Sequence, residues 1–221
     1  KSNFLTSYIF DPVNNPSGQP RMSLGYSLGA LLTLFAKCGL TQFGKDEVGS
    51  LTKVMNKTLL QFDIENPLEK NIAKLLSQKL KNKIPVLVSS EHLWGVTHAF
   101  KNQLNENAKT FTCVFDIPEL NHHLLEGLKF PPEAKEVLYF VFLKSKLYSP
   151  RVIKRFGITQ EVIEKNDYPH SSYELTSGTK LEQVFESLIF GSFVNYYLAM
   201  LYGIDPTPIP WVDYFKEKMG R

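Results

Sequence analysis

Cysteine is scarce in this sequence, and no pattern of metal-binding residues accompanies it. The 221 residues contain two cysteines, Cys38 and Cys113, and neither belongs to a Cys-x-x-Cys or Cys/His pattern. A disulfide framework and a zinc site therefore have little support, and a reducing compartment such as the cytoplasm is the expected location. Both cysteines lie in apolar surroundings, so we expect both to pack in the core.

Long uninterrupted apolar runs are also missing. The most apolar stretch, residues 185–201, is broken by Glu186, Gly191, Ser192 and Asn195, so we expect a buried helix and no membrane span. The first residues carry no charged region before an apolar run, which argues against a signal peptide. Because the chain starts at Lys1 without an initiator methionine, we expect it to be part of a longer protein.

Neither positive nor negative charge predominates in the sequence. The formal net charge is +3, and the basic residues are scattered in ones and twos. This pattern gives no basic groove for a nucleic acid, whereas an anionic small molecule is compatible with it.

The hydrophobic pattern predicts an α/β fold that is preceded by helices. Expected helices cover residues 21–39, 46–62 and 66–80, the last with Asn66 as N-cap and Pro67 in the first turn. Short apolar runs at 84–88, 110–115 and 137–143 then alternate with helical segments at 93–108, 150–165 and 180–202. Such runs are typical of strands buried on both faces. We therefore predict a three-layer α/β/α sandwich with a mainly parallel sheet.

The segment before the sheet has two features of its own. Residues 11–20 contain three prolines and a glycine, which is a linker composition. The side chains of Leu24, Leu28, Leu31 and Phe35 share one face of the first helix. We expect another domain or subunit to cover this face, because large apolar patches seldom remain bare.

Candidate site residues follow the first two strands. Ligands of parallel sheets bind beyond the carboxyl ends of the strands, so residues 89–92 and 116–123 are the loops of interest. The segment 119–127, which starts in the second loop, brings together two carboxylates, an amide and two imidazoles, from Glu119, Glu126, Asn121, His122 and His123.

Here a resemblance becomes specific. Residues 119–122, Glu-Leu-Asn-His, resemble the signature of bifunctional phosphoglucose/phosphomannose isomerases, which consist of two sugar-isomerase (SIS) domains. Three further stretches resemble the same family in the same order. They are residues 19–26 with Gln19-Pro20-Arg21, residues 101–109 (KNQLNENAK), and residues 203–210 (GIDPTPIP) followed by Val212, Asp213 and Lys216.

The resemblance implies a Rossmann-like SIS domain over residues 21–221, with residues 1–20 as the end of a preceding domain and a linker. It implies the C-terminal half of an enzyme of carbohydrate metabolism and glycolysis. That enzyme interconverts aldose 6-phosphates and fructose 6-phosphate by proton transfer through an enediol.

The resemblance also implies a role for each matched residue. Glu119 aligns with the base, Arg21 with the arginine that faces the developing negative charge, and Lys216 with a lysine that reaches the sugar ring oxygen. The base works best if partial burial raises the pKa of its carboxyl group toward working pH. Without the family, Glu119 would be read as a helix cap, Arg21 as a surface residue of a linker and Lys216 as a solvated lysine.

The histidines depart from the family pattern. Relatives open the sugar ring with a histidine downstream of the base, but this chain has none between His123 and His170, and Ser149-Pro150-Arg151 stands where many relatives have His-Pro-Arg. We therefore take His122 and His123 as the candidates for ring opening, with orientation of the loop by a hydrogen bond as an equal alternative for His122. His123 replaces an asparagine of the family pattern, which leaves the substrate preference open. The expected substrate contacts are Asn121, His123 and Thr207.

The phosphate clamp is missing as well. Nothing here resembles the family's Ser-Gly-Asn-Thr loop, which belongs to its first SIS domain. Ser89 and Ser90 are candidates to contact the substrate, although two serines that end a strand are more often turn residues. We expect a sugar-phosphate substrate, a missing N-terminal SIS domain, a homodimer, no cofactor or metal, and no activity of this chain alone.

One alternative belongs to another class of protein. SIS domains also serve as non-catalytic sugar-phosphate-binding modules in regulators. Retention of Glu119, Arg21 and Lys216 together favours the enzyme, because a sensor needs none of them for proton transfer. A Ser- or Cys-dependent hydrolase has little support, since no Gly-x-Ser-x-Gly elbow occurs.

Overall fold

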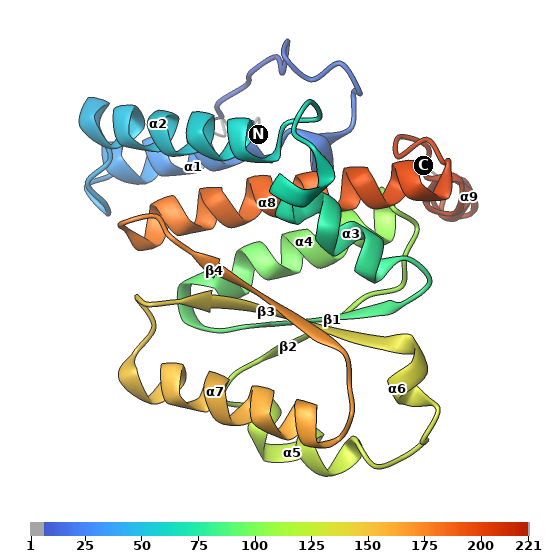
Figure 1. Cartoon of the computed structure of the whole chain (residues 1–221). Helices are drawn as coiled ribbons and strands as arrows, with labels where there is room; N and C mark the ends of the chain where they lie inside the picture. Colours follow the sequence, from blue (N-terminus) through green and yellow to red (C-terminus); the bar gives the residue numbers. More distant parts are fainter. Residues whose placement is uncertain (1–6, 221) are drawn as a thin grey trace. The chain divides into compact units, whose positions relative to one another are not determined.

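The computed structural model describes residues 7–220 (Figure 1). The chain forms two compact units, Lys1–Val48 and Gly49–Arg221. The predicted boundary between residues 20 and 21 stays a prediction.

The first unit is built on helix α1, Leu24–Lys37, after a 3₁₀ turn at Pro20–Met22. The helix ends as expected at Gly39, whose φ of 71° lies in the left-handed region that glycine adopts without strain. No residue of α1 is buried. The expectation for Cys38 was wrong, because this residue follows the last turn of α1 and is exposed, whereas Cys113 is partly buried.

A four-stranded parallel sheet forms the centre of the second unit and confirms the predicted fold class. The strands are β1 (Ile84–Ser89), β2 (Cys113–Asp116), β3 (Leu138–Ser145) and β4 (His170–Leu175), in the order β2-β1-β3-β4. Strand β2 begins at Cys113, three residues later than predicted. The hydroxyl groups of Thr110 and Thr112, in the segment before it, donate to the carbonyls of Ala108 and Thr110.

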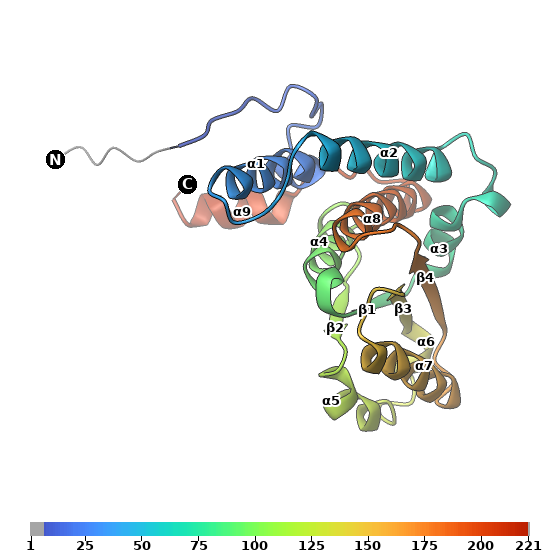
Figure 2. The ribbon, with the colours of Figure 1, turned by 90° about the vertical axis from the view of Figure 1, so that its left-hand side faces the viewer.

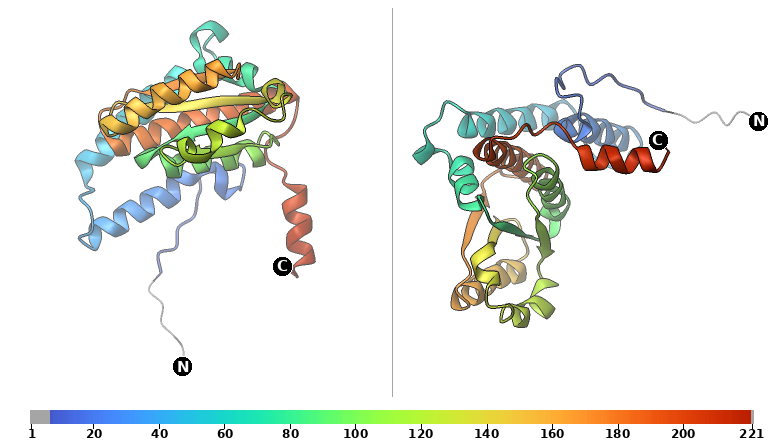
Figure 3. Two further views of the ribbon diagram at one scale, coloured as in Figure 1. Left: turned by 90° about the horizontal axis from the view of Figure 1, so that it is seen from below. Right: turned by 90° about the vertical axis from the view of Figure 1, so that its right-hand side faces the viewer.

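Helices cover both faces of the sheet, which makes the three predicted layers (Figures 2 and 3). Helices α3 (Ile72–Leu80), α4 (Trp94–Glu106) and α8 (Lys180–Tyr202) lie on one face. Helices α5 (Leu120–Gly127) and α7 (Pro150–Lys165) lie on the other. Helix α2 (Lys45–Phe62) precedes α3, the short α6 (Ala134–Val137) leads into β3, and α9 (Pro210–Lys218) ends the fold.

The start of α3 corrects one prediction. Its N-cap is the fully buried Asn71, whose Oδ1 accepts from the N–H groups of Ala73 and Lys74 at 3.1 and 3.2 Å. Asn66 instead donates to carbonyls in the last turn of α2. The Asn66-Pro67 pair therefore closes one helix and enters a 3₁₀ turn at Leu68–Lys70 before the next helix begins.

Helix α8 is the most buried helix, as expected for residues 185–201. It is long and apolar enough to cross a membrane by length and composition, but 56% of its most apolar window is buried inside the fold. It also buries the polar side chains Glu182, Gln183, Glu186 and Asn195. A helix with this much buried polar surface needs partners for each group.

The end of α4 supplies partners for Asn195: the Asn195 Nδ2 atom donates to Gln103 Oε1 at 3.3 Å. Asn107, just after α4, donates to Asn195 Oδ1 at 2.9 Å, and Asn195 Nδ2 donates to the Gly191 carbonyl at 2.7 Å. A Cβ atom at Gly191 would lie 2.8 Å from the Phe100 ring, so the two helices approach closely only because this residue is glycine.

The Lys109 ammonium donates to the Pro208 carbonyl at 2.5 Å. Residues 101–109 and 203–210 therefore lie against each other.

The close approach of α4 and α8 predicts the effect of two matched substitutions. Gly191→Ala forces a methyl group into the Phe100 ring and should lower the free energy of unfolding by about 1–3 kcal/mol. Gly157→Ala, in α7, meets open space and should be neutral or stabilising by up to about 1 kcal/mol. Urea unfolding measures both, and equal changes in the two variants would contradict the packing described here.

Candidate functional site

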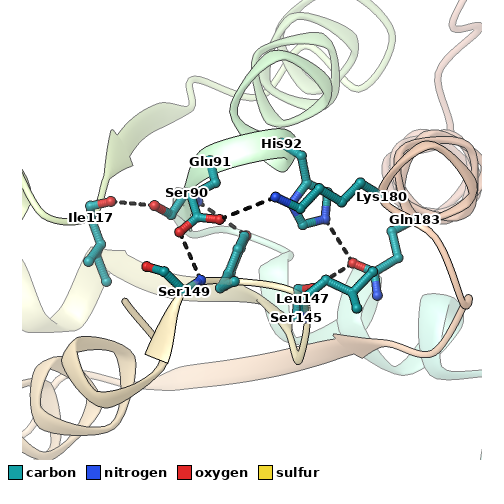
Figure 4. Close-up of polar contacts among 10 residues, drawn as sticks. Ser90, Glu91, His92, Ile117, Ser145, Leu147, Ser149, Lys180 and Gln183 are labelled. Atoms are coloured by element: carbon teal, nitrogen blue, oxygen red, sulfur yellow. Dashed lines mark hydrogen bonds and ion pairs between the residues drawn. The ribbon is translucent and has the colours of Figure 1, made fainter. Parts of the chain in front are cut away.

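All four strands end at the same edge of the sheet, because they are parallel. The chain leaves β1 toward β2 on one side and leaves β3 toward β4 on the other, so the loops after β1 and β3 diverge. Open α/β sheets bind ligands at such a switch point. A cluster of polar side chains fills this position (Figure 4).

Gln183, near the start of α8, is the centre of this cluster. Its Oε1 atom lies 2.8 Å from His92 Nε2 and accepts a hydrogen bond from Ser145 Oγ at 2.6 Å. Its Nε2 atom donates to the Ser177 carbonyl at 3.0 Å, which fixes the orientation of the amide. An amide oxygen only accepts, so His92 must carry its proton on Nε2.

Glu91, which follows Ser90 at the end of β1, is the charged member of the cluster. Its Oε1 accepts from the N–H of Ser149 at 2.9 Å, and its Oε2 lies 3.9 Å from Lys180 Nζ. Burial pushes the pKa of Glu91 upward, but the Ser149 hydrogen bonds and the charge of Lys180 outweigh it and hold the pKa below its usual value. The carboxyl group is therefore ionised at neutral pH.

The two candidate serines are buried. Ser89 is fully buried, and its hydroxyl has no hydrogen-bond partner among residues 7–220. The hydroxyl of Ser90 donates to the Ile117 carbonyl, and its backbone N–H donates to the Tyr148 hydroxyl at 3.1 Å. Ser90 thus ties the end of β1 to the loop after β2, which favours the interpretation as turn residues.

Glu119 lies at the same edge, immediately before α5. Its Oε2 atom is 2.6 Å from His123 Nε2, one helical turn later, and the two side chains are 60% and 44% exposed. The partial burial expected for the base is therefore not found in this chain. The imidazole that contacts Glu119 belongs to His123, whereas His122 is exposed next to it.

Asn121 points away from this pair. Its Nδ2 atom donates to Thr159 Oγ1 at 2.7 Å, and its Oδ1 atom accepts from Arg155 Nη1 at 3.3 Å. Both partners belong to α7, so Asn121 joins α5 to α7.

The other candidate residues lie elsewhere. Lys216 is exposed on α9, which follows α8 on the side of the sheet away from α5 (Figures 1 and 2). The N–H of Thr207 donates to Asp205 in the loop before α9. Arg21 belongs to the first unit, where its guanidinium donates to Gln19 Oε1 at 2.7 Å.

Three members of the switch-point cluster are not among the candidates predicted from the sequence: Ser145, Lys180 and Gln183. A signal existed in Thr179-x-x-Glu182, a capping box that marks the start of α8 and thereby places Lys180 and Gln183 near the edge of the sheet. No group of three or more His, Cys, Asp or Glu side chains arranged to hold a metal ion occurs among the described residues.

Comparisons with known proteins point in one direction. Residues 69–219 match the family described as bacterial phospho-glucose isomerase C-terminal SIS domain. The bifunctional phosphoglucose/phosphomannose isomerase of Caldicellulosiruptor bescii is 33% identical over 96% of this chain and 63% of its own length. The enzyme of the same name from Thermoplasma volcanium is 28% identical over 98% of this chain and 66% of its own length. The chain thus spans less than two thirds of each relative.

Solved structures show the same fold. A glucose-6-phosphate isomerase like protein from Thermus thermophilus superposes with a TM-score of 0.66 at 22% identity, over 80% of this chain and 58% of that protein. The C-terminal domain of glucosamine-fructose-6-phosphate aminotransferase from Francisella tularensis gives a TM-score of 0.54 at 12% identity, over 74% of this chain and 46% of that one.

The central position of Gln183 predicts a large effect of its removal. Gln183→Leu leaves the N–H of His92 and the hydroxyl of Ser145 without their shared acceptor, so the free energy of unfolding should fall by about 2–4 kcal/mol. Gln160→Leu removes an exposed contact to Ser172 and should change it by about 0.5 kcal/mol or less. Chemical denaturation compares the two, and a loss for Gln183→Leu as small as that for Gln160→Leu would contradict the network.

Proposed function

The chain belongs to the family of bacterial phosphoglucose isomerase C-terminal SIS domains, and on this basis we propose that it is the C-terminal half of a glucose-6-phosphate/mannose-6-phosphate isomerase. The observation that carries the proposal is the Glu119–His123 pair. It places an accessible carboxylate, with an imidazole 2.6 Å away, at the edge of the sheet where α/β proteins bind ligands.

Glu119 is the proposed base. Aldose–ketose isomerisation removes the proton from C2 of the open-chain sugar and returns it to C1 through an enediol. A carboxylate that faces solvent is reachable by a substrate, and His123 orients it. The alternative interpretation of Glu119 as a helix cap has little support, because its side chain makes no capping hydrogen bond to α5.

The remaining roles follow from the resemblance and stay proposals. The charge that develops on the enediolate oxygen requires a cation, for which Arg21 is the candidate, and Lys216 is the candidate for the ring oxygen. His122 and His123 remain the candidates for ring opening. Asn121, His123 and Thr207 are the proposed substrate contacts, although the Asn121 side chain faces α7 in this chain.

Assembly and location belong to the same proposal. The substrate phosphate would be held by an N-terminal SIS domain, and the enzyme would be a cytoplasmic homodimer of glycolysis. The exposed Leu31 and Phe35 of α1, at 48% and 43%, support an additional partner surface on this helix. Without the phosphate-binding loop of that N-terminal domain, this chain alone would be inactive.

The base is tested by Glu119→Gln in the full-length enzyme that carries this half. The amide keeps the shape of the side chain but accepts no proton, so incorporation of solvent deuterium into fructose 6-phosphate should fall by about 10²–10⁴-fold with nearly unchanged affinity for the sugar phosphate. The matched control is Glu126→Gln, an exposed carboxylate on the same helix, which should exchange normally.

Two results would count against the proposal. Exchange by Glu119→Gln at the unmodified rate would show that Glu119 is not the base. Binding of sugar phosphate without exchange by the unmodified full-length protein would favour a non-catalytic binding module.

The role of Arg21 gives a separate prediction. Arg21→Lys keeps a cation but loses the planar fork of the guanidinium, so kcat/KM for glucose 6-phosphate should fall less than it does in Arg21→Ala. Steady-state kinetics of the two variants of the full-length enzyme compare them directly. Equal losses of kcat/KM would mean that the positive charge at this position does not contribute to catalysis.

A further inference from the structure

Three buried polar atoms near the start of helix α8 have no hydrogen-bond partner in the part of the chain that the structure describes. They are Ser89 Oγ at the end of β1, His92 Nδ1 in the 3₁₀ turn at Glu91–Leu93, and Ser187 Oγ in α8. Ser89 and Ser187 are fully buried. A buried hydroxyl group or ring nitrogen without a partner costs free energy, so each of these atoms requires an explanation.

Ser187 belongs to the face of α8 that carries Gln183. The two residues are four positions apart, which places their side chains one above the other on the same side of the helix. Gln183 Oε1 lies 2.8 Å from His92 Nε2 and 2.6 Å from Ser145 Oγ (Figure 4). The Ser187 side chain is therefore directed toward the sheet, on the side of α8 that also contacts the turn with His92.

The Ser89 side chain faces the same layer of helices. Strands β1 and β3 pair in parallel with Val88 opposite Phe142, so these two side chains share one face of the sheet. The Phe142 ring packs against Phe156 of α7, with the ring centroids 6.2 Å apart, so Val88 faces the α7 layer. Successive side chains of a strand point to opposite faces, and Ser89 consequently faces the layer of α4 and α8.

The two serines also lie at a similar depth below the carboxyl edge of the sheet. Helix α8 starts at this edge beside Ser145, and its last residue, Tyr202, contacts the segment that leads into β1, so the helix runs back along the sheet. Ser187 therefore lies one helical turn, about 5.4 Å, below Gln183. The register places Ser89 two residues, about 6.6 Å, below the level of Ser145. The hydroxyl groups of Ser89 and Ser187 thus approach one space from opposite sides.

The hydrogen-bonding roles of the three atoms define the molecule that fits between them. His92 Nε2 donates to Gln183, so His92 Nδ1 carries a lone pair and requires a donor. An anion would face this lone pair. A metal ion would find two hydroxyl groups and one imidazole, which supply no negative charge to compensate for its desolvation. A water molecule can donate to Nδ1 and to one hydroxyl group and accept from the other, which makes the three hydrogen bonds typical of buried water.

We propose that Ser89, Ser187 and His92 form an internal water site that joins the end of β1 to α8. The bound water pairs the three polar atoms and donates to the lone pair of His92 Nδ1. It thereby favours the tautomer in which Nε2 donates to Gln183, and it supports the switch-point cluster from inside the fold. The site does not include Glu119 and does not depend on the proposed isomerase activity.

A crystal structure at a resolution that shows ordered water tests the site directly. We expect one water molecule within about 2.7–3.2 Å of Ser89 Oγ, Ser187 Oγ and His92 Nδ1. A water that contacts only one of the two serines would overturn the shared site. Rotation of both hydroxyl groups onto protein carbonyls, with no water between them, would overturn it as well.

Stability measurements test whether the two hydroxyl groups are paired in solution. Ser77→Ala is the matched control, because Ser77 is also fully buried in a helix and donates to the carbonyls of Ala73 and Val194 at 2.7 and 2.9 Å. Its loss should raise the equilibrium constant for unfolding about two- to tenfold. A water partner predicts an increase of similar size for Ser89→Ala and for Ser187→Ala. A decrease in both variants would show that the hydroxyl groups are unpaired and would overturn the proposal.

The double variant Ser89→Ala/Ser187→Ala tests whether one water is shared. Two serines that hold the same water lose it together, so the combined increase should be smaller than the product of the two single increases by about twofold or more. Ser77→Ala combined with Ser89→Ala shares no partner and should give the simple product. A simple product for the pair of Ser89 and Ser187 would mean that the two hydroxyl groups are independent, and the shared site would be wrong.

Discussion

The rest of the second unit depends on the burial of helix α8. A helix of 23 residues that buries glutamate, glutamine and asparagine side chains is stable only if each of them is paired. Asn195 is paired with Asn107 near the end of α4, and Gln183 and Glu186 are paired with the loops after β3 and β4. The polar groups that keep α8 in the core therefore also arrange the edge where the site lies.

The parts of this fold that could be predicted from sequence are those governed by local pattern. β1 and β3 are buried on both faces, and their apolar runs identified them to within two residues. β4 was missed because it is an edge strand in which only Tyr173 and Leu175 are buried. The contact between His92 and Gln183 joins residues 91 positions apart, so no local pattern could reveal it. The contact between Glu119 and His123 spans one helical turn, which the spacing allowed.

Carboxylates at the carboxyl edge of the sheet are held in two different ways. Glu91 and Glu186 accept hydrogen bonds from backbone N–H groups. The hydrogen bonds from Ser149 and the charge of Lys180 outweigh the effect of burial and hold the pKa of Glu91 below its usual value, which makes this carboxylate a poor proton acceptor. Glu119 accepts none from the backbone of α5 and is reachable from solvent. Glu119 is the most exposed of these three carboxylates and is therefore the one that a substrate can reach most easily.

The same contrast bears on how a substrate would be held. Proton abstraction by a carboxylate requires the reacting carbon within about 3–3.5 Å, and a firm hold on a remote phosphate is an effective way to ensure it. Here the backbone donors after β3 and β4 are bound to internal carboxylates, so they contribute stability in place of substrate affinity. The proposed role of Glu119 as the base therefore requires that the substrate phosphate be held by other residues than these backbone donors. On that proposal, the position of the reacting carbon depends on how rigidly those residues are fixed relative to the loop that carries Glu119.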